Sequence, residues 1–199
     1  MSTPPKTPDR PELTFPDAEA AAIRAAYGAA EVILEYGSGG STVLAAELGK
    51  TVWTIESDKD WADMMKAWFR DNPTPGKAHV VYSDIGATRE WGQPVDDSGW
   101  KRYARYPLGV WDNDRFKHPD VVLVDGRFRV GCALATAYRI TRPVTLYFDD
   151  YAGRERLHVV EEFLGAPAEI IGRMARFEIS PQSVPADRLL KMVQLMSRP

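Results

Sequence analysis

A glycine-rich turn near the start of the chain is the first feature with a clear chemical use. The run Glu35-Tyr36-Gly37-Ser38-Gly39-Gly40-Ser41 lies between an apolar segment that predicts a strand, 32–34, and a predicted helix, 41–48. Glycines in such a turn let the backbone approach a ligand closely, and the start of the helix offers free N–H groups. The turn therefore predicts a site for a charged, nucleotide-like ligand.

A carboxylate follows the turn at the spacing of a ribose ligand. Glu56 ends the second predicted strand, about 20 residues after Gly37, the offset at which an acidic side chain accepts hydrogen bonds from ribose hydroxyls. A dinucleotide site would carry a third glycine where this chain has Thr42. An acidic Glu35 beside the turn suits the positive sulfonium or amino group of S-adenosylmethionine (SAM) better than a pyrophosphate. These features favour SAM over NAD.

Three further carboxylates follow two later predicted strands. Asp125 comes directly after the strand 121–124, and Asp149 and Asp150 follow the strand 144–148. Because neighbouring parallel strands end at the same edge of a sheet, we expect the three side chains to lie together. Unpaired carboxylates repel one another, and Mg²⁺ would remove that repulsion with the oxygen ligands that it prefers. The cluster is therefore a candidate metal site.

The same carboxylates also have an interpretation without a metal. Asp125 or Asp149 would then act as a base, or the carboxylates would pair with nearby arginines. Such arginines could instead clamp a carboxylate or phosphate of a substrate, or form ordinary surface ion pairs. The arginines in question are Arg127, Arg129, Arg154 and Arg156.

The elements around these residues alternate between strand and helix patterns. Parallel strands joined by helices indicate a doubly wound α/β fold. Three apolar segments close the chain without a further helix after them, which predicts a strand-rich, antiparallel end of the sheet. The five predicted parallel strands are 32–34, 51–55, 79–83, 121–124 and 144–148, and the closing segments are 169–171, 177–179 and 190–196.

One connection is far longer than the roughly 2 to 6 residues usual between strand and helix in such folds. Residues 86–117 are rich in aromatic side chains and leave the sheet just after Asp84, at the edge where parallel sheets bind ligands. We predict a substrate lid here, with a surface insertion or a dimer contact as the alternative. The remaining organisation is a flexible, proline-rich arm over 1–16 and a single domain over 17–199.

In this order and spacing the chain resembles the class I SAM-dependent methyltransferases. Their first motif, acidic-x-Gly-x-Gly-x-Gly, is matched by Glu35, Gly37 and Gly39, while Ser41 replaces the last glycine and Gly40 is shifted by one place. The resemblance implies a mostly parallel, seven-stranded sheet with an antiparallel C-terminal hairpin. It spans about residues 30–165.

The resemblance also assigns roles to individual residues. It implies that the glycine turn holds SAM, with Ser38 and Ser41 among the contacts, that Glu56 followed by Ser57 binds the ribose, and that Asp84 and Ile85 lie beside the adenine. Asp125 would face the methyl acceptor. Together with Asp149 and Asp150 it is similar to the ligand set of metal-dependent O-methyltransferases of the catechol and macrolide-sugar types, in which the metal lowers the pKa of a substrate hydroxyl.

The function that follows is methyl transfer from SAM to a small molecule, with oxygen as the preferred acceptor atom. Aminopropyl transfer of the polyamine-synthase type is an alternative, because those enzymes share this fold and an acidic site. A SAM-binding scaffold without catalysis is another, since a fold does not prove a function.

Composition limits the partners. A formal net charge of −3 and a pI of about 5.7 leave no basic surplus for phosphates, so we expect no nucleic-acid partner. No run of about 18 apolar residues could span a membrane, and a signal peptide is missing, so a cytoplasmic location is expected. A homodimer remains open. The single cysteine, Cys132, lies in an apolar stretch and reads as a core residue.

Overall fold

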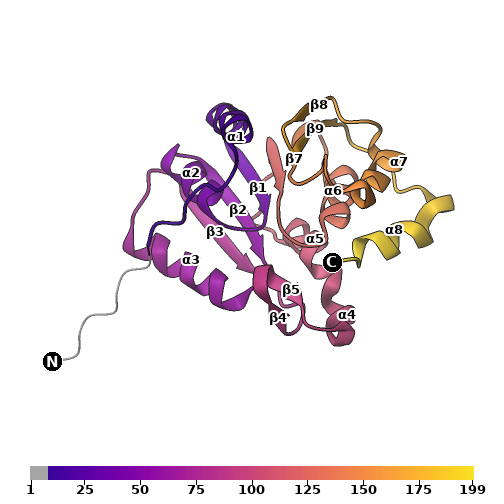
Figure 1. Ribbon diagram of the computed structural model, residues 1–199, viewed down its shortest axis with the longest axis horizontal. Helices are drawn as coiled ribbons and strands as arrows, with labels where there is room; N and C mark the ends of the chain where they lie inside the picture. The colour runs from indigo at the N-terminus through magenta and orange to yellow at the C-terminus, as the bar shows by residue number, and fades with distance from the viewer. Residues whose placement is uncertain (1–8) are drawn as a thin grey trace.

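Seven strands join in one sheet in the order β3-β2-β1-β6-β7-β9-β8 (Figure 1). The computed structural model describes residues 9–199. The strands from β3 to β7 pair in parallel, whereas β9 runs antiparallel to β7 and β8 antiparallel to β9. The predicted doubly wound sheet with an antiparallel hairpin is confirmed. The strands are β1 (Val32–Tyr36), β2 (Thr51–Glu56), β3 (Lys77–Tyr82), β6 (Val121–Val124), β7 (Val144–Phe148), β8 (Glu169–Ile171) and β9 (Met174–Ile179).

The strand order reverses between β1 and β6, which pair directly along the register Ile33 to Val121. From β1 the chain first builds outward through β2 and β3, and then returns to add β6 and β7 on the other side. In open α/β sheets, ligands bind outside the carboxyl ends of the strands at such a reversal. The fold therefore places the glycine turn and Asp125 at this reversal, and we call the region outside these strand ends the crevice.

Helices cover both faces of the sheet, because alternate residues of each strand point to opposite sides. Ile33 belongs to the core under α1 (Asp17–Ala29) and α2 (Gly40–Glu47), and the next residue, Leu34, packs in the core under α6 (Arg129–Arg139). Figure 1 shows α1, α2 and α3 on one side and α6 and α8 on the other. The remaining regular helices are α3 (Lys59–Asp71), α7 (Glu161–Leu164), preceded by the 3-10 helix Glu155–Val160, and α8 (Leu189–Met196).

The end of the chain differs from the expectation of a strand-rich tail. The segment 190–196 belongs to the helix α8, in which Met192, Leu195 and Met196 are buried. This spacing of three and four residues gives one apolar helical face. The face packs closely on α6, where a Cβ added to Gly131 would lie 2.8 Å from the Cα of Met196. The apolar residues of this segment therefore follow the period of a helix and not that of a strand.

The long connection 86–117 folds into short elements that pack on the molecule. Tyr103, Tyr106 and Val110 are buried in the main core, and α5 contacts α6. Trp91 and Trp100, in contrast, are 87% and 62% exposed. The elements are a hairpin of β4 (Thr88–Arg89) and β5 (Gln93–Pro94), then α4 (Trp100–Tyr103) and α5 (Arg105–Leu108), with 3-10 turns at Glu90–Gly92, Asp97–Gly99 and Gly109–Asp112.

Part of the predicted N-terminal arm packs against the glycine turn. Phe15 is buried with α1, and Arg10 forms a 2.8 Å ion pair with Glu47. A Cβ at Gly40 would lie 2.2 Å from the Glu12 carbonyl carbon, so only glycine admits the arm here. Residues 1–8 of the arm lie outside the described part. Among residues 9–199, the helices are too short or too polar for a membrane span.

Candidate active site

The glycine turn after β1 interlocks with the turn after β6. Gly37 has a φ of 101°, in the left-handed region that favours glycine, and its N–H donates to the Ile55 carbonyl across 2.9 Å. A Cβ at Gly37 would lie 2.9 Å from the backbone nitrogen of Gly126. The two turns that border the crevice therefore touch through glycine backbones, which explains why both positions are glycine.

Glu56 ties the ends of β1 and β2 together. Its Oε2 atom accepts hydrogen bonds from the backbone nitrogen and the hydroxyl of Ser38, at 3.2 and 3.0 Å, and Oε1 accepts from the backbone nitrogens of Ser57 and Asp58, at 2.7 and 3.0 Å. Burial raises the pKa of Glu56, and these hydrogen bonds oppose the rise. Trp61 adds a bond from its indole N–H to the Ser38 carbonyl, at 2.8 Å.

Glu35 lies behind the turn and not in the crevice. It is fully buried, and its two carboxylate oxygens accept hydrogen bonds from the hydroxyls of Tyr27, at 2.7 Å, and Thr42, at 2.5 Å. The Thr42 hydroxyl in turn accepts the N–H of Gly39 at 3.1 Å. Burial raises the pKa of Glu35 to about 7. In place of the ligand contact expected from the sequence, Glu35 supports the turn from the side of α1, and Ser41 is buried beside it.

The segment 86–117 covers the residues expected to hold the ribose. The Ser57 hydroxyl donates to the Gly92 carbonyl across 2.9 Å. A Cβ at Gly92 would lie 2.4 Å from that hydroxyl and 3.3 Å from Oε1 of Glu56. Glu56 itself is only 8% exposed. A ribose can therefore reach this carboxylate only after the β4–β5 hairpin has moved.

The same segment also covers the position expected for the adenine. Asp84, on the surface, pairs with Arg102 of α4 at 2.5 Å. Ile85 is fully buried, and a Cβ at Gly99 would lie 1.9 Å from its carbonyl oxygen. The Tyr106 ring lies over the interlocked glycines, since a Cβ at Gly126 would come within 2.1 Å of its hydroxyl. The 86–117 segment thus packs against the positions expected for both the ribose and the adenine.

The three carboxylates at the ends of β6 and β7 converge as expected, with oxygen atoms of Asp125, Asp149 and Asp150 all within 4.8 Å of one another. Asp149 is 1% exposed, and its Oδ1 and Oδ2 atoms accept from Nε and Nη2 of Arg173, each across 2.9 Å. Arg173 lies in the β8–β9 turn. The antiparallel hairpin brings it here, and no local spacing in the sequence marks it.

Arginines pair with all three carboxylates. Arg129, itself 92% buried at the start of α6, lies 3.1 Å from both Asp125 and Asp150, and Arg154 lies 2.6 Å from Asp150. Burial raises the pKa of Asp125 against the opposing effect of Arg129, and the neighbouring Asp149 adds to the rise. Of the arginines considered from the sequence, Arg129 and Arg154 form these pairs, whereas Arg127 and Arg156 do not.

These ion pairs bear on the magnesium expected at the cluster. Three guanidiniums already offset the three negative charges, so repulsion does not require a cation. Both oxygens of Asp149 are taken by Arg173, and an ion would have to displace guanidinium groups to gain several ligands here. The donor set does not fit Mg²⁺ in this arrangement.

The crevice, by contrast, has the chemistry that SAM requires. The glycine turn offers close backbone approach at the start of α2, and Glu56 offers a carboxylate at the end of β2. Gly92 of the 86–117 segment lies against Glu56, and Tyr106 lies against Gly126 beside the turn. The chemistry of the crevice residues fits SAM.

Comparison with known proteins gives the family. Neither a protein-family model nor a curated protein matches the chain. The crystal structure of a methyltransferase-like protein from Silicibacter pomeroyi DSS-3 is 60% identical, with a TM-score of 0.92 over 96% of this chain and 99% of that chain. The chain therefore belongs to the same family of methyltransferase-like proteins.

More distant structures show the same fold. An O-methyltransferase from Bacillus cereus in complex with SAH is 14% identical, with a TM-score of 0.53 over 79% of this chain and 70% of that chain. Cofactor-bound Rv0187 from MTB is also 14% identical, with a TM-score of 0.58 over 87% and 85%. The predicted methyltransferase family and its fold are confirmed.

Proposed function

We propose that the protein transfers a methyl group from SAM to an oxygen of a small molecule. The observation that carries the proposal is the crevice at the strand-order reversal, where the interlocked glycine turns lie beside Glu56 in a chain of the methyltransferase-like family. When bound, SAM supplies a methyl group that is already activated for transfer, so the protein mainly has to bind and orient the two reactants.

The cofactor is held by residues of the crevice. The turn from Gly37 to Ser41 lies along it, Glu56 accepts hydrogen bonds from the ribose hydroxyls, and Asp84 with Ile85 borders the adenine. Each role needs the 86–117 segment to open, because Gly92, Gly99 and Tyr106 now contact these positions. The segment is therefore a lid over the cofactor as well as over the acceptor.

Asp125 is the residue best placed to accept the proton of the acceptor hydroxyl. Its side chain is 34% exposed, whereas Asp149 is buried and held by Arg173. A raised pKa brings a carboxylate closer to the range in which a base works near neutral pH. Asp149 and Arg129 are positioning residues, which fix the Asp125 carboxylate in the crevice. The reaction proposed needs no Mg²⁺.

Titration calorimetry with S-adenosylhomocysteine (SAH) tests the cofactor. We expect saturable binding of SAH, no binding of NAD, and a loss of at least tenfold in affinity for Glu56→Gln. Glu90→Gln is the matched control, because Glu90 is an exposed glutamate of the 86–117 segment. Absence of SAH binding to the wild-type protein at millimolar concentration would contradict the proposal.

The covered crevice gives weight to a second function, a scaffold that binds SAM without catalysis. In that case SAH would bind, but a screen of hydroxylated acceptors with labelled SAM would give no methylated product. Transfer of an aminopropyl group from decarboxylated SAM is distinguished in the same screen by the mass of the product. The homodimer and the cytoplasmic location stay predictions.

A further inference from the structure

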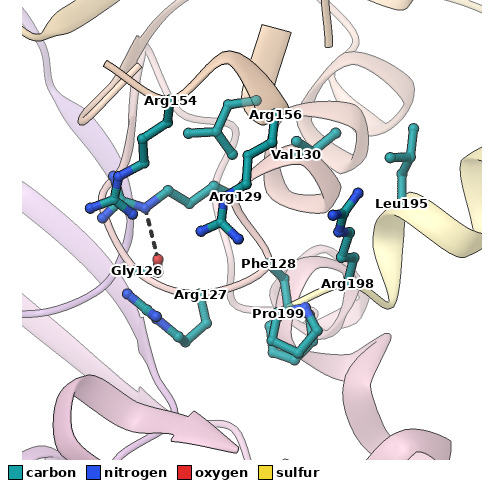
Figure 2. Close-up of a pocket in the computed structure, with 11 residues that line it drawn as sticks. Gly126, Arg127, Phe128, Arg129, Val130, Arg154, Arg156, Leu195, Arg198 and Pro199 are labelled. Atoms are coloured by element: carbon teal, nitrogen blue, oxygen red, sulfur yellow. Dashed lines mark hydrogen bonds between the residues drawn. The ribbon is translucent and has the colours of Figure 1, made fainter. Parts of the chain in front are cut away.

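A pocket lined by five arginines opens beside the acidic cluster, which consists of Asp125, Asp149 and Asp150. We call it the arginine pocket (Figure 2). Figure 2 shows that its walls come from three parts of the chain: the β6–α6 turn with the start of α6, the segment after β7, and the end of α8 with the residues that follow it. The five arginines are Arg127, Arg129, Arg154, Arg156 and Arg198.

Three of these guanidiniums have no acidic partner. Arg129 and Arg154 pair with the carboxylates of the acidic cluster, but across residues 9–199 no carboxylate lies within 4.0 Å of Arg127, Arg156 or Arg198. Arg156 and Arg198 line the same hollow from different elements, and Arg127 lines its edge with the guanidinium directed away from Arg198 (Figure 2). Like charges held together at this density repel, and an anion between them would remove the repulsion.

Arg127 is the arginine whose burial among other positive charges is most clearly unfavourable. Its Nε atom is buried and has no hydrogen-bond partner. Burial lowers the pKa of Arg127, and the charge of Arg129 adds to this effect. A buried donor without an acceptor is uncommon and costs about 1–3 kcal/mol. The Arg127 guanidinium therefore lacks both a carboxylate and a full set of hydrogen-bond acceptors among residues 9–199.

The backbone around the pocket favours the same kind of ligand. Phe128, Arg129 and Val130 form the start of α6, a helix of 11 residues. The positive end of its dipole and the free N–H groups of its first turn therefore lie at this wall of the pocket. Phe128 and Asp150 both have left-handed backbone conformations, with φ of 51° and 57°. Such strain in residues other than glycine gathers at functional sites.

From these observations we infer that the arginine pocket binds the oxyanion of the methyl acceptor, a phosphate or a carboxylate. Its cavity volume of about 40 Å³ is several times what a single water needs, so an anionic head group has room there. Arg129 lines the pocket and also pairs with Asp125, so an acceptor anchored here extends toward Asp125. The anion site stands on its own contacts, and only its assignment to the acceptor rests on the proposed function.

Titration calorimetry with inorganic phosphate and with malonate tests the site. We expect saturable phosphate or malonate binding to the wild-type protein, weakened at least tenfold in Arg156→Gln/Arg198→Gln. Both side chains are exposed, so the double variant should fold. The control, Arg24→Gln/Arg70→Gln, removes two exposed arginines from α1 and α3 and should change the affinity less than twofold. The tighter of the two anions identifies the head group as phosphate or carboxylate.

Equal weakening in both double variants, or no saturable binding of either anion, would overturn the anion site. SAH titrations of the same proteins keep the two proposals apart, because Arg156 and Arg198 form none of the hydrogen bonds that hold Glu56. Arginine-dependent anion binding in a protein that does not bind SAH supports the site and removes its assignment to a methyl acceptor. SAH binding without anion binding leaves the methyltransferase proposal standing and overturns the pocket.

Discussion

The Tyr106 hydroxyl donates a hydrogen bond to the Ile55 carbonyl oxygen, 3.1 Å away, and thereby fixes an aromatic ring of the 86–117 segment at the carboxyl end of β2. The same hydroxyl accepts the backbone N–H of Arg127 at 3.3 Å. The ring is fully buried between the turns that follow β2 and β6. SAM would have to replace these contacts in order to bind. The more stable these contacts are, the weaker the affinity for the cofactor should be.

Tyr106→Phe should therefore tighten the binding of SAH. The substitution keeps the ring and removes a hydrogen bond worth about 1 kcal/mol in the closed state, which corresponds to roughly fivefold in affinity if binding requires opening. Titration calorimetry measures the change. Tyr138→Phe, a half-buried tyrosine of α6, is the control and should leave the affinity as it is. Weaker binding by Tyr106→Phe would mean that the hydroxyl holds the cofactor.

Local patterns were sufficient to predict the parallel strands and the edge of the sheet at which the three carboxylates lie. The apolar runs 121–124 and 144–148 are the strands β6 and β7 at the predicted bounds, and the acidic residues that follow them meet in space. This worked because the carboxyl ends of parallel strands share one edge of the sheet, so chain position fixes spatial position.

Contacts between distant parts of the chain could not be predicted in this way. Arg173 reaches Asp149 only because the β8–β9 hairpin folds back beside β7, and the sequence contains no spacing that relates the two. The motif also could not predict where the Glu35 side chain points, because its hydrogen bonds to the buried hydroxyls of Tyr27 and Thr42 determine its orientation. The closure of the crevice by Gly92 and Tyr106 depends on packing of the whole long segment.

Asp125→Asn should lower kcat by roughly 10²- to 10⁴-fold, the usual contribution of a general base, while SAH affinity changes little. In the wild-type enzyme the base must be deprotonated. Because burial raises the pKa of Asp125, activity should fall as the pH drops through the neutral to mildly acidic range, well before an ordinary aspartate would protonate. The pH profile of kcat checks this. A variant that keeps wild-type kcat would exclude Asp125 as the base.

The methyl transfer should be insensitive to EDTA and to added Mg²⁺. The carboxylates of the acidic cluster already pair with Arg129, Arg154 and Arg173, which occupy the oxygens that a cation would need. Initial rates measured with EDTA, and after readdition of Mg²⁺, provide the measurement. Loss of activity in EDTA that Mg²⁺ restores would show that a metal displaces these arginines in the working enzyme.

The buried Glu35 should make stability depend on pH. Burial raises its pKa from an ordinary value of 4.5 to about 7, so the folded protein binds a proton that the unfolded chain releases between these values. This contribution to the free energy of unfolding is complete below pH 4.5 and is lost, by about 3 kcal/mol, as the pH rises through 7. Urea unfolding across this range should show the decline for the wild-type protein and for Glu31→Gln, an exposed control. In Glu35→Gln the corresponding decline should be absent. An equal slope for Glu35→Gln would show that the carboxylate is already ionised in the fold and that Tyr27 and Thr42 offset its burial.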